Sequence, residues 1–407
     1  MAIPVLYISY DGMTDSLGQS QVIPYLIGLT KKGYAFTLMS CEKEENFKQH
    51  KNKIQSILDA NNIIWYPISY TKKPPVLSTV YDVNRLKRLA FQLHKEKHFS
   101  IVHCRSYIAA LVGLQLKKKY PIKFVFDMRG LWADERVDGK LWNLNHPIYK
   151  TVYNYFKKKE RQFLENADYT ISLTFNAKNE ILSWKNITNN PINIQVIPCC
   201  ADLDLFDKNK IQQDRLAAFK KELNILQDDF ILLYLGSIGT WYMLDEMMEF
   251  FSVLKQKNNK AKFLFVTKDE HDRILKTAEK YGVRDQIIIR AGNRDDIPYL
   301  IALSHYSLFF ILPSYSKKAS SPTKQGEIMA MGVPIICNTN VGDTDKIVTD
   351  YKSGILVNNF SVSVYQNAIN EIETTHDEQQ IIAGAQDYFS LENGIEKYAE
   401  VYKAILS

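Results

Sequence analysis

The sequence has no apolar run near the roughly 18–20 residues that a membrane-spanning helix needs, which argues against an integral membrane protein. It begins MAIPVLYISYDG, without a basic segment, an apolar segment and a small-residue cleavage site in succession. We therefore interpret this start as a β-strand and not as an export signal. Cysteine is scarce, with five residues and no CxxC pair. That pattern is typical of a reducing cytoplasm and argues against a disulfide framework or a structural zinc site.

Other motifs are missing as well. No GxGxxG is present, which disfavours dinucleotide binding. No recognisable nucleic-acid-reading module appears, so nucleic acid is not an expected partner. The 407 residues are 46% hydrophobic and 24% charged, which excludes a disordered or fibrous chain. Their number predicts two or three domains.

Charge is divided unevenly along the chain. Residues 1–200 carry 28 Lys and Arg against 16 Asp and Glu, a net +12, whereas the remainder carries 23 against 29, a net −6. This asymmetry suggests that the two halves face different partners, and that the basic half meets an anionic membrane surface or a phosphorylated lipid. The alternative is that the lysines only keep one half soluble.

Short apolar runs rich in β-branched and aromatic residues alternate with longer amphipathic segments. Such runs are typical of parallel strands that are covered on both faces. The predicted strands are 5–10, 35–40, 63–68, 100–104, 123–127, 169–174 and 194–198, then 230–236, 261–267, 286–290, 306–312, 333–338 and 354–358. The predicted helices are 17–31, 79–97, 107–119, 148–166, 243–257, 269–281, 296–304 and 323–331. This βαβ rhythm predicts an α/β fold with open, doubly wound parallel sheets.

The rhythm restarts after PCCADLDLF (198–206), which predicts two Rossmann-like domains, at 1–198 and 199–388. The segment 389–407 is an amphipathic helix that could pack back on the first domain. Its apolar positions are Ile395, Tyr398, Val401, Tyr402 and Ile405. Open α/β sheets bind ligands at the carboxyl ends of their strands. Two such edges facing a central cleft would suit transfer of a group from a nucleotide carrier to an acceptor.

The loop after the first predicted strand, SYDGMTDSLGQS (9–20), is long and polar and leads into a helix. Gly12 and Gly18 would let the backbone approach a phosphate, and the N-terminus of the helix offers free N–H groups. The alternative is that the two glycines only permit a tight turn.

The segment LPSYSKKASSPTKQGEIMAMGVPIICN (312–338) combines a strand end, a polar loop and a helix that begins near Thr323. Ser321 and Thr323 offer hydroxyl and N–H groups at the start of that helix, and Lys324 adds a cation, so anion binding is expected there. Glu327, one turn later, can reach a ribose diol. The alternative for Glu327 is a charge that only complements the helix dipole. Gly332 is predicted to stop the helix.

This segment resembles the signature helix of glycosyltransferase family 4, which has the GT-B fold. Residues 10–34, 194–206 and 232–247 resemble the N-terminal loop and helix, the interdomain linker and the first C-terminal-domain strand of that family. The resemblance spans nearly the whole chain. It implies a transferase of the type found in bacterial surface polysaccharide biosynthesis, with a nucleotide-diphosphate sugar bound by the C-terminal domain and an acceptor bound by the N-terminal domain. It also implies retention of anomeric configuration, no cofactor and no metal.

The resemblance assigns the ribose contact to Glu327, the second glutamate of a Glu-x7-Glu motif. The first falls at Ala319 and is missing. The Arg and Lys that commonly hold the diphosphate are also missing from the loop at 236–242. We therefore expect Lys324, its helix N-terminus and backbone N–H groups of the loop to neutralise the leaving diphosphate. The predicted donor-binding residues are Gly18, Gly236, Ser237, Gly239, Thr240, Ser321, Thr323, Lys324 and Glu327.

The stretch FVFDMRGLWADERVDG (124–139) ends a strand and is crowded with charge. In the comparable region many members of the family have a histidine that contacts the donor sugar. The resemblance makes Arg129 the nearest equivalent of that histidine, and Arg129 could bind a phosphate or a sugar hydroxyl. Asp127 or Glu135 could orient Arg129 or contact the acceptor, and in an inverting enzyme either could act as the base. The alternative is an ion-pair network that caps the sheet edge. The predicted catalytic residues are Arg129, Asp127 and Lys324, and the acceptor-side candidates are Asp11, Ser16, Arg105 and Glu135.

The segment 146–168 mixes aromatic residues with Lys157, Lys158, Lys159 and Arg161, which suits a membrane interface. Its apolar face would pack in the core, and its basic face would be solvated or near lipid head groups. The expected function is therefore a cytoplasmic glycosyltransferase, peripheral on the inner face of the plasma membrane, acting on a glycan or a polyprenyl-diphosphate-linked glycan. The alternatives are a nucleotide-sugar epimerase or hydrolase of the same fold, and a degenerate scaffold subunit without turnover.

Overall fold

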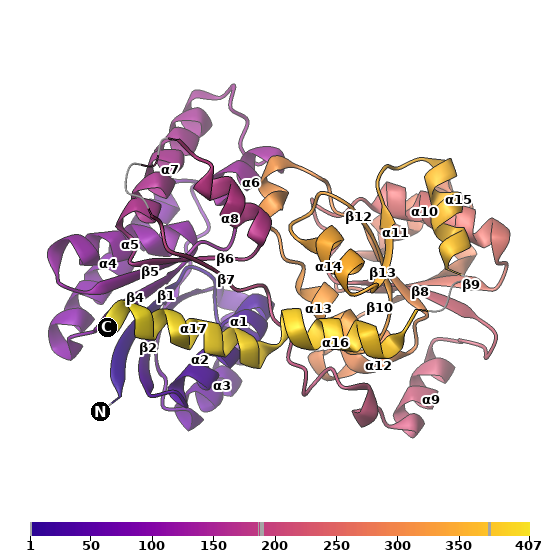
Figure 1. Cartoon of the computed structure of the whole chain (residues 1–407), viewed down its shortest axis with the longest axis horizontal. Helices are drawn as coiled ribbons and strands as arrows, with labels where there is room; N and C mark the ends of the chain where they lie inside the picture. Colours follow the sequence, from indigo (N-terminus) through magenta and orange to yellow (C-terminus); the bar gives the residue numbers. More distant parts are fainter. Residues whose placement is uncertain (1, 186, 188–190, 373–375) are drawn as a thin grey trace. The chain divides into compact units, whose positions relative to one another are not determined.

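The computed structural model describes residues 2–185, 187, 191–372 and 376–407. The chain divides into two compact units. Unit 1 comprises Met1–Pro198 together with Leu391–Ser407, and unit 2 comprises Cys199–Ser390. Figure 1 shows that each unit contains its own sheet with helices around it. Within the described ranges, every helix is too short or too polar to cross a membrane.

In the described part of unit 1, seven parallel strands form one sheet in the order β3-β2-β1-β4-β5-β6-β7. Their bounds are β1 Ile3–Ser9, β2 Tyr34–Glu42, β3 Ile64–Ser69, β4 Ile101–Arg105, β5 Lys123–Asp127, β6 Tyr169–Ser172 and β7 Ile194–Val196. The central strands are buried along nearly their whole length, as expected for a parallel sheet with both faces covered. The order reverses between β1 and β4, which makes that point the expected ligand edge of the sheet.

The helices of unit 1 are α1 Ser16–Gln21, α2 Ile23–Thr30, α3 Glu44–Ala60, α4 Leu77–Lys97, α5 Ser106–Lys119, α6 Trp132–Asp138, α7 Pro147–Asn166, α8 Phe175–Leu182 and α17 Leu391–Leu406. The single helix predicted at 17–31 is wrong, because the chain breaks at Val22 into two helices. Pro24 causes the break, since it has no N–H to donate and its ring would clash with the carbonyl four residues earlier. Pro24 instead lies in the first turn of α2, where it is tolerated.

In the described part of unit 2, six parallel strands form a second sheet in the order β10-β9-β8-β11-β12-β13. They are β8 Phe230–Leu235, β9 Ala261–Val266, β10 Ile287–Arg290, β11 Tyr306–Phe309, β12 Ile335–Asn338 and β13 Gly354–Val357. The helices are α9 Gln213–Glu222, α10 Leu244–Lys257, α11 His271–Lys280, α12 Ile297–Ala302, α13 Thr323–Ala330, α14 Thr344–Asp350, α15 Val362–Glu371 and α16 Glu378–Phe389, and short 3-10 turns join them. Here the order reverses between β8 and β11.

The predicted α/β class with doubly wound parallel sheets is confirmed, and each predicted strand overlaps an observed one. The stop predicted at Gly332 is also confirmed. α13 ends at Ala330, and Gly332 takes a left-handed φ of 72°, a conformation that glycine adopts without steric cost. α6 lies where the sequence indicated only a charged stretch after a strand.

Helix α17 packs on α2 within unit 1 (Figure 1). The approach is close, because a Cβ added to Gly28 would lie 2.2 Å from Cδ1 of Ile395. Tyr398 and Tyr402 of the same helix are buried, as the amphipathic pattern predicts. Ring contacts join Tyr398 to Tyr25 and Tyr402 to Tyr34. This packing brings the hydroxyl of Tyr398 to Asp127, at the end of β5, and the hydroxyl of Tyr402 to His103, within β4.

Candidate functional site

The ammonium group of Lys324 lies at the edge where the strand order of unit 2 reverses. Lys324 is the second residue of α13, and Gly236 directly follows β8 with a φ of 110°. A Cβ built on Gly236 would lie 3.4 Å from Nζ of Lys324. Because Gly236 has no side chain, the backbone there and the ammonium group border the same space. This pair matches the predicted combination of a helix-borne cation and a glycine loop.

Lys324 is nine-tenths buried, and its Nζ has no hydrogen-bond partner among the described residues. Its nearest neighbours are rings: the ring centroids of Tyr242 and Tyr234 lie 3.8 and 4.3 Å from Nζ. Burial lowers the pKa of Lys324 to about 7, and the charge of Glu327 offsets only part of that effect. A buried ammonium without an acceptor is costly, so this group is poised to take an anion.

The loop after β8 is already partly occupied by a carboxylate. Asp269 accepts hydrogen bonds from the backbone N–H of Ile238 and, at 2.9 Å, from the hydroxyl of Ser237. The N–H of Gly236 donates to the carbonyl of Val266 at 2.9 Å. The expectation that all backbone N–H groups of this loop face a ligand is therefore wrong for Gly236 and Ile238. The predicted residues Gly239 and Thr240 lie exposed in the same loop.

Two arginines near this edge were not predicted. Nη1 of Arg273, from α11, donates to the carbonyl of Gly239 at 3.3 Å, so one exposed cation does approach the loop that lacks its own. Arg294 pairs with the carboxylate of Glu327 and lies over the ring of Phe206 at 4.7 Å. Burial raises the pKa of Glu327, and Arg294 and Lys324 offset part of that rise. The predicted ribose ligand thus carries an arginine partner that its helical spacing could not reveal.

The remaining predicted donor residues of α13 lie at its start. Thr323 is its first residue, and Pro322 at the N-cap supplies no side-chain cap. The hydroxyl of Ser321 accepts the backbone N–H of Cys199 at 3.1 Å, which ties the segment 199–201 to this loop. Ala319, where the resemblance leads one to expect a glutamate, is buried. The start of α13 therefore offers Lys324 and the N-terminus of the helix to a ligand, but not the first glutamate of the Glu-x7-Glu motif.

In unit 1 a buried carboxylate lies at the end of β5, the strand next to β4, which borders the order reversal. Asp127 ends β5 and is 1% exposed. Its Oδ1 lies 3.8 Å from Nη1 of Arg129, and its Oδ2 lies 4.0 Å from Nη1 of Arg105 and 3.5 Å from Nε2 of His103. Asp11, half-exposed in the loop after β1, lies 3.4 Å from Nε of Arg105. The structure thus brings together four of the residues predicted for catalysis and acceptor binding.

The electrostatics of this cluster favour an ion-paired Asp127. Burial alone would raise the pKa of Asp127, but Arg129, His103 and Arg105 together hold it below its ordinary value. Burial lowers the pKa of His103, although Asp127 opposes that shift. Nε and Nη1 of Arg105 have no hydrogen-bond partner among the described residues. Arg129 has a φ of 58°, in the left-handed region, a strained conformation that is common at functional sites.

The backbone N–H groups in the loop after β1 are bound by a side chain of the protein itself. Glu42, the last residue of β2, accepts the backbone N–H groups of Met13 and Thr14 at 2.7 and 3.1 Å, and the hydroxyl of Thr14 as well. A Cβ on Gly18 would lie 2.3 Å from the carbonyl oxygen of Gly12. Gly18 therefore lets α1 lie against its own loop, which gives this glycine a structural reason, and its role in donor binding stays a prediction.

The other two acceptor-side candidates come from α1 and α6. Ser16 is the exposed first residue of α1, and its carbonyl accepts the hydroxyl of Ser20. Glu135 lies half-buried in α6. Its neighbour Asp134 accepts hydrogen bonds from Tyr153 and Lys157, each at 2.8 Å, and thereby joins α6 to α7.

Within the described ranges, no group of three or more His, Cys, Asp or Glu side chains is placed to hold a metal ion. All five cysteines are buried and unbridged.

Comparison with known proteins identifies the family. The Glycosyltransferase Family 4 model matches residues 23–205, and the Glycosyl transferases group 1 model matches residues 217–386. Alpha-monoglucosyldiacylglycerol synthase from Streptococcus pneumoniae is 20% identical over 283 residues, which make up 64% of this chain and 60% of that relative. The match thus spans less than two thirds of the relative's length.

Solved structures share the fold over the whole chain. A glycosyltransferase from Rickettsia africae ESF-5 has a TM-score of 0.74 at 17% identity, with 100% of this chain and 99% of that one covered. HepE from Anabaena, solved in complex with UDP and glucose, has a TM-score of 0.68 at 14% identity, with 98% and 99% covered. The two family models together leave out little beyond the chain ends and a short central segment. The chain is therefore a glycosyltransferase, a member of glycosyltransferase family 4 with the GT-B fold.

Proposed function

We propose that this glycosyltransferase takes its sugar from a nucleotide-diphosphate donor bound by unit 2. The observation that carries the proposal is the buried ammonium of Lys324, which borders Gly236 and has no hydrogen-bond partner among the described residues. A diphosphate would supply the missing acceptor, and the start of α13 would add N–H groups. Glu327, on the same helix, would accept the ribose hydroxyls. The UDP and glucose bound by HepE support a donor of this class.

The reaction breaks the bond between the sugar and the diphosphate, so negative charge develops on the departing phosphate oxygen. Lys324 would stabilise that charge in a site where water is largely excluded. In a retaining transfer without a metal, the departing oxygen would itself take the acceptor proton on the same face of the sugar. No protein base is then required. The ion-paired state of Asp127 favours this route, because a carboxylate whose pKa is lowered is a poor base.

The acceptor, in this proposal, is a glycan or a glycan linked to a polyprenyl diphosphate in surface polysaccharide assembly, and unit 1 binds it. Arg105 and Arg129 would contact its phosphate or hydroxyl groups, and Asp127 would orient both guanidinium groups. The name of the Streptococcus pneumoniae relative, a glucosyldiacylglycerol synthase, supports a lipid-containing acceptor. This support comes by analogy, because members of one fold differ in their substrates.

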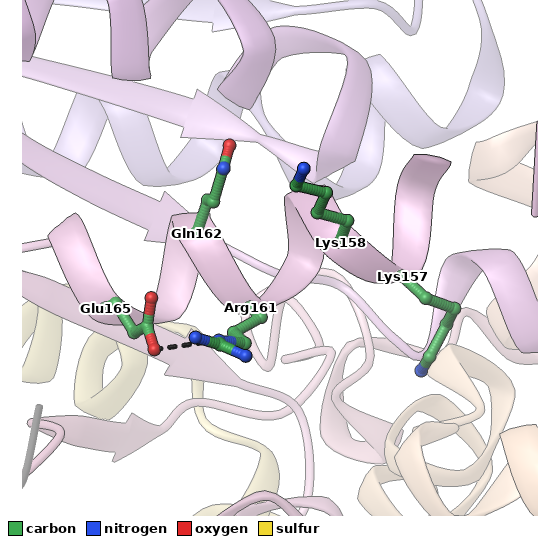
Figure 2. A pocket seen from close by; sticks show the side chains of 5 residues that line it. All are labelled: Lys157, Lys158, Arg161, Gln162 and Glu165. Atoms are coloured by element: carbon green, nitrogen blue, oxygen red, sulfur yellow. Dashed lines mark hydrogen bonds and ion pairs between the residues drawn. The ribbon is translucent and has the colours of Figure 1, made fainter. Parts of the chain in front are cut away.

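A membrane surface is the third part of the proposal, and α7 is the element that would meet it. Lys158 and Arg161 are exposed on this helix, and Ile148 and Tyr155, which precede them, each leave about half of the side chain exposed. Figure 2 shows Lys158 and Arg161 projecting from α7 at a pocket of about 420 Å³. Cations beside exposed apolar groups favour the interface of an anionic bilayer, and we place the enzyme on the cytoplasmic face.

The donor site is tested by calorimetric titration of UDP, GDP, ADP and CMP, and of the nucleoside of whichever of them binds, into wild-type protein and two variants. Lys324→Ala should weaken the nucleoside diphosphate at least tenfold, roughly the value of one charge-assisted contact, and leave nucleoside binding nearly unchanged. Glu327→Ala should weaken both. Lys318→Ala, an exposed lysine six residues before Lys324, is the matched control. Equal affinities for wild type and both site variants would remove this assignment.

The membrane face is tested by flotation with liposomes that contain anionic or only zwitterionic lipid, at low and high salt. Binding should require anionic lipid and weaken with salt. The double variant Lys158→Gln, Arg161→Gln should float less than the control Lys51→Gln, Lys53→Gln, which removes the same charge from α3. Equal flotation of the two variants would exclude α7 as the contact.

A further inference from the structure

Two hydroxyl groups of the C-terminal helix reach the buried cluster of unit 1. The hydroxyl of Tyr398 donates to Oδ2 of Asp127 at 3.1 Å, and the hydroxyl of Tyr402 lies 2.6 Å from Nδ1 of His103. The two tyrosines are one helical turn apart on α17, so they face the same side of that helix. Helix α17 therefore takes part in the cluster through directed hydrogen bonds as well as through ring packing.

The arrangement fixes where the imidazole proton of His103 resides. Nε2 of His103 faces the carboxylate of Asp127 at 3.5 Å, and an ionised carboxylate only accepts. Nε2 must therefore carry the hydrogen, which leaves Nδ1 of the neutral ring as an acceptor. Tyr402 then donates to Nδ1. Tyr402 thus hydrogen-bonds His103, whose Nε2 faces Asp127 at 3.5 Å without a hydrogen bond, and Tyr398 donates to the same carboxylate oxygen.

Oδ2 of Asp127 accepts from Tyr398 and faces His103 and the guanidinium of Arg105, while Oδ1 faces the guanidinium of Arg129. Oδ1 has no hydrogen bond and lies 3.8 Å from Nη1 of Arg129. Arg129 has a left-handed backbone and is followed by Gly130 with a φ of 143°, so its own backbone conformation is not a locally favoured one. The Asp127 carboxylate is thus one of the groups that constrain where the guanidinium points.

We propose that Tyr398 and Tyr402 are positioning residues: through Asp127 and His103 they aim the guanidinium of Arg129 at the acceptor. This inference rests on the proposed function, in which Arg129 contacts the acceptor. It assigns a role in the reaction to the last helix of the chain, whose residues are 271 and 299 positions away from the side chains they hold. Arg105 shares the same carboxylate from β4, so its guanidinium is aimed as well.

Packing alone does not account for the two hydroxyls. Phenylalanine at 398 and 402 would keep the ring contacts with Tyr25, Tyr34 and His103. A buried hydroxyl carries a desolvation cost that only a hydrogen bond offsets. The other ionisable groups beside Asp127 and His103 are Tyr7, whose ring centroid is 4.5 Å from that of His103, and Arg105.

The test is steady-state transfer by the full-length enzyme with Tyr398→Phe. We expect kcat/KM for the acceptor to fall about tenfold, with the KM of the donor unchanged, because displacing a positioning contact costs rate. Tyr34→Phe is the control. It removes a hydroxyl that donates to a backbone carbonyl of α17 at 3.5 Å, and its ring packs on Tyr402, yet it does not touch Asp127. Wild-type kinetics for Tyr398→Phe would overturn the inference.

A double-mutant cycle separates positioning from stability. If Tyr398 acts through Arg129, Tyr398→Phe should cost nothing further in an Arg129→Ala background, whereas a purely structural effect would be additive. An additive loss overturns the inference. Wild-type transfer by Arg129→Ala alone would instead overturn the role of Arg129 in the proposed function. Loss of transfer in Arg129→Ala with none in Tyr398→Phe would remove only the role of α17.

A spectroscopic measurement tests Tyr402 without relying on turnover. The ring ¹⁵N shifts of His103 should report the Nε2–H tautomer in the wild type, and Tyr402→Phe should shift the Nδ1 resonance because its donor is lost. Tyr34→Phe should leave both resonances in place. A wild-type ring protonated on Nδ1 would contradict the chain of donors described here.

Discussion

The carboxylate of Glu42 accepts the backbone N–H of Met13 at 2.7 Å, so an internal anion occupies the turn after the first strand of unit 1. Unit 2 repeats the device, since Asp269, just after β9, accepts from the turn after β8. In each sheet the acidic residue comes from the strand that pairs with the one before the turn. These turns are where many Rossmann-like folds bind phosphate, and here a carboxylate holds part of each.

The first prediction concerns Glu42. Glu42→Gln replaces one accepting oxygen by an NH₂ group, which would face the N–H groups of Met13 and Thr14 or the hydroxyls that now donate to it. We expect the free energy of unfolding to fall by about 2 kcal/mol, as for a buried donor left unpaired. Denaturant unfolding measures the change, with Glu45→Gln, three residues on and exposed, as the control. A loss no larger than that of the control would contradict the role given to Glu42.

The second prediction concerns Asp269, which is part-exposed and accepts hydrogen bonds from the loop proposed to hold the donor diphosphate. Asp269→Asn keeps one accepting oxygen for the N–H of Ile238 and removes a charge that repels phosphate. We expect nucleoside diphosphates to bind about threefold more tightly, as Coulomb's law gives for one charge some ångströms away near solvent. Calorimetry measures this, with Glu270→Gln as the control for long-range charge. Weaker binding would mean that the ionised carboxylate is needed to shape the loop.

The strands could be predicted from the sequence because buried parallel strands are continuous apolar runs, and the lengths of these runs can be read without a structure. The sequence also placed Lys324 and Glu327 on one helix, since a helix start is marked by local residues. Contacts between residues far apart in the sequence could not be predicted. Arg294 reaches Glu327 from another element, and Tyr398 reaches Asp127 across 271 positions. A possible signal was the acidic residue near the end of the second strand in each half.

The third prediction concerns Arg294, the partner of Glu327. Burial already raises the pKa of Glu327, and Arg294→Ala should raise it further by removing an opposing charge. A raised carboxyl pKa costs stability only where the unfolded chain would be ionised, so the loss should be small below pH 4 and grow as the pH rises through neutrality. We expect a loss of about 2 kcal/mol at pH 7, typical of a buried group that loses a charged partner.

Denaturant unfolding at pH 4 and pH 7 measures that difference between Arg294→Ala and wild type. Arg284→Ala is the control, because Arg284 pairs with the exposed Glu279 and such pairs contribute little. An equal loss at both pH values would mean that Arg294 acts by packing on Phe206 and not by its charge.

The fourth prediction concerns the proton carried by Lys324. Burial lowers the pKa of this ammonium to about 7, so at pH 8 most of the free protein holds it neutral. A diphosphate favours the charged form and raises the pKa, so binding should take up close to one proton at pH 8.

Affinity for UDP, or for whichever of GDP and ADP binds, should therefore fall as the pH rises from 7 to 9. The terminal phosphate of the nucleotide also titrates near the lower end of that range, and the same measurement with Lys324→Ala separates its contribution. Calorimetry in buffers of different ionisation enthalpy counts the protons directly, and Lys324→Ala should abolish the uptake whereas Lys318→Ala should preserve it. Proton uptake that persists in Lys324→Ala would assign the proton to another group. It would contradict the proposal that the ammonium of Lys324 binds the diphosphate.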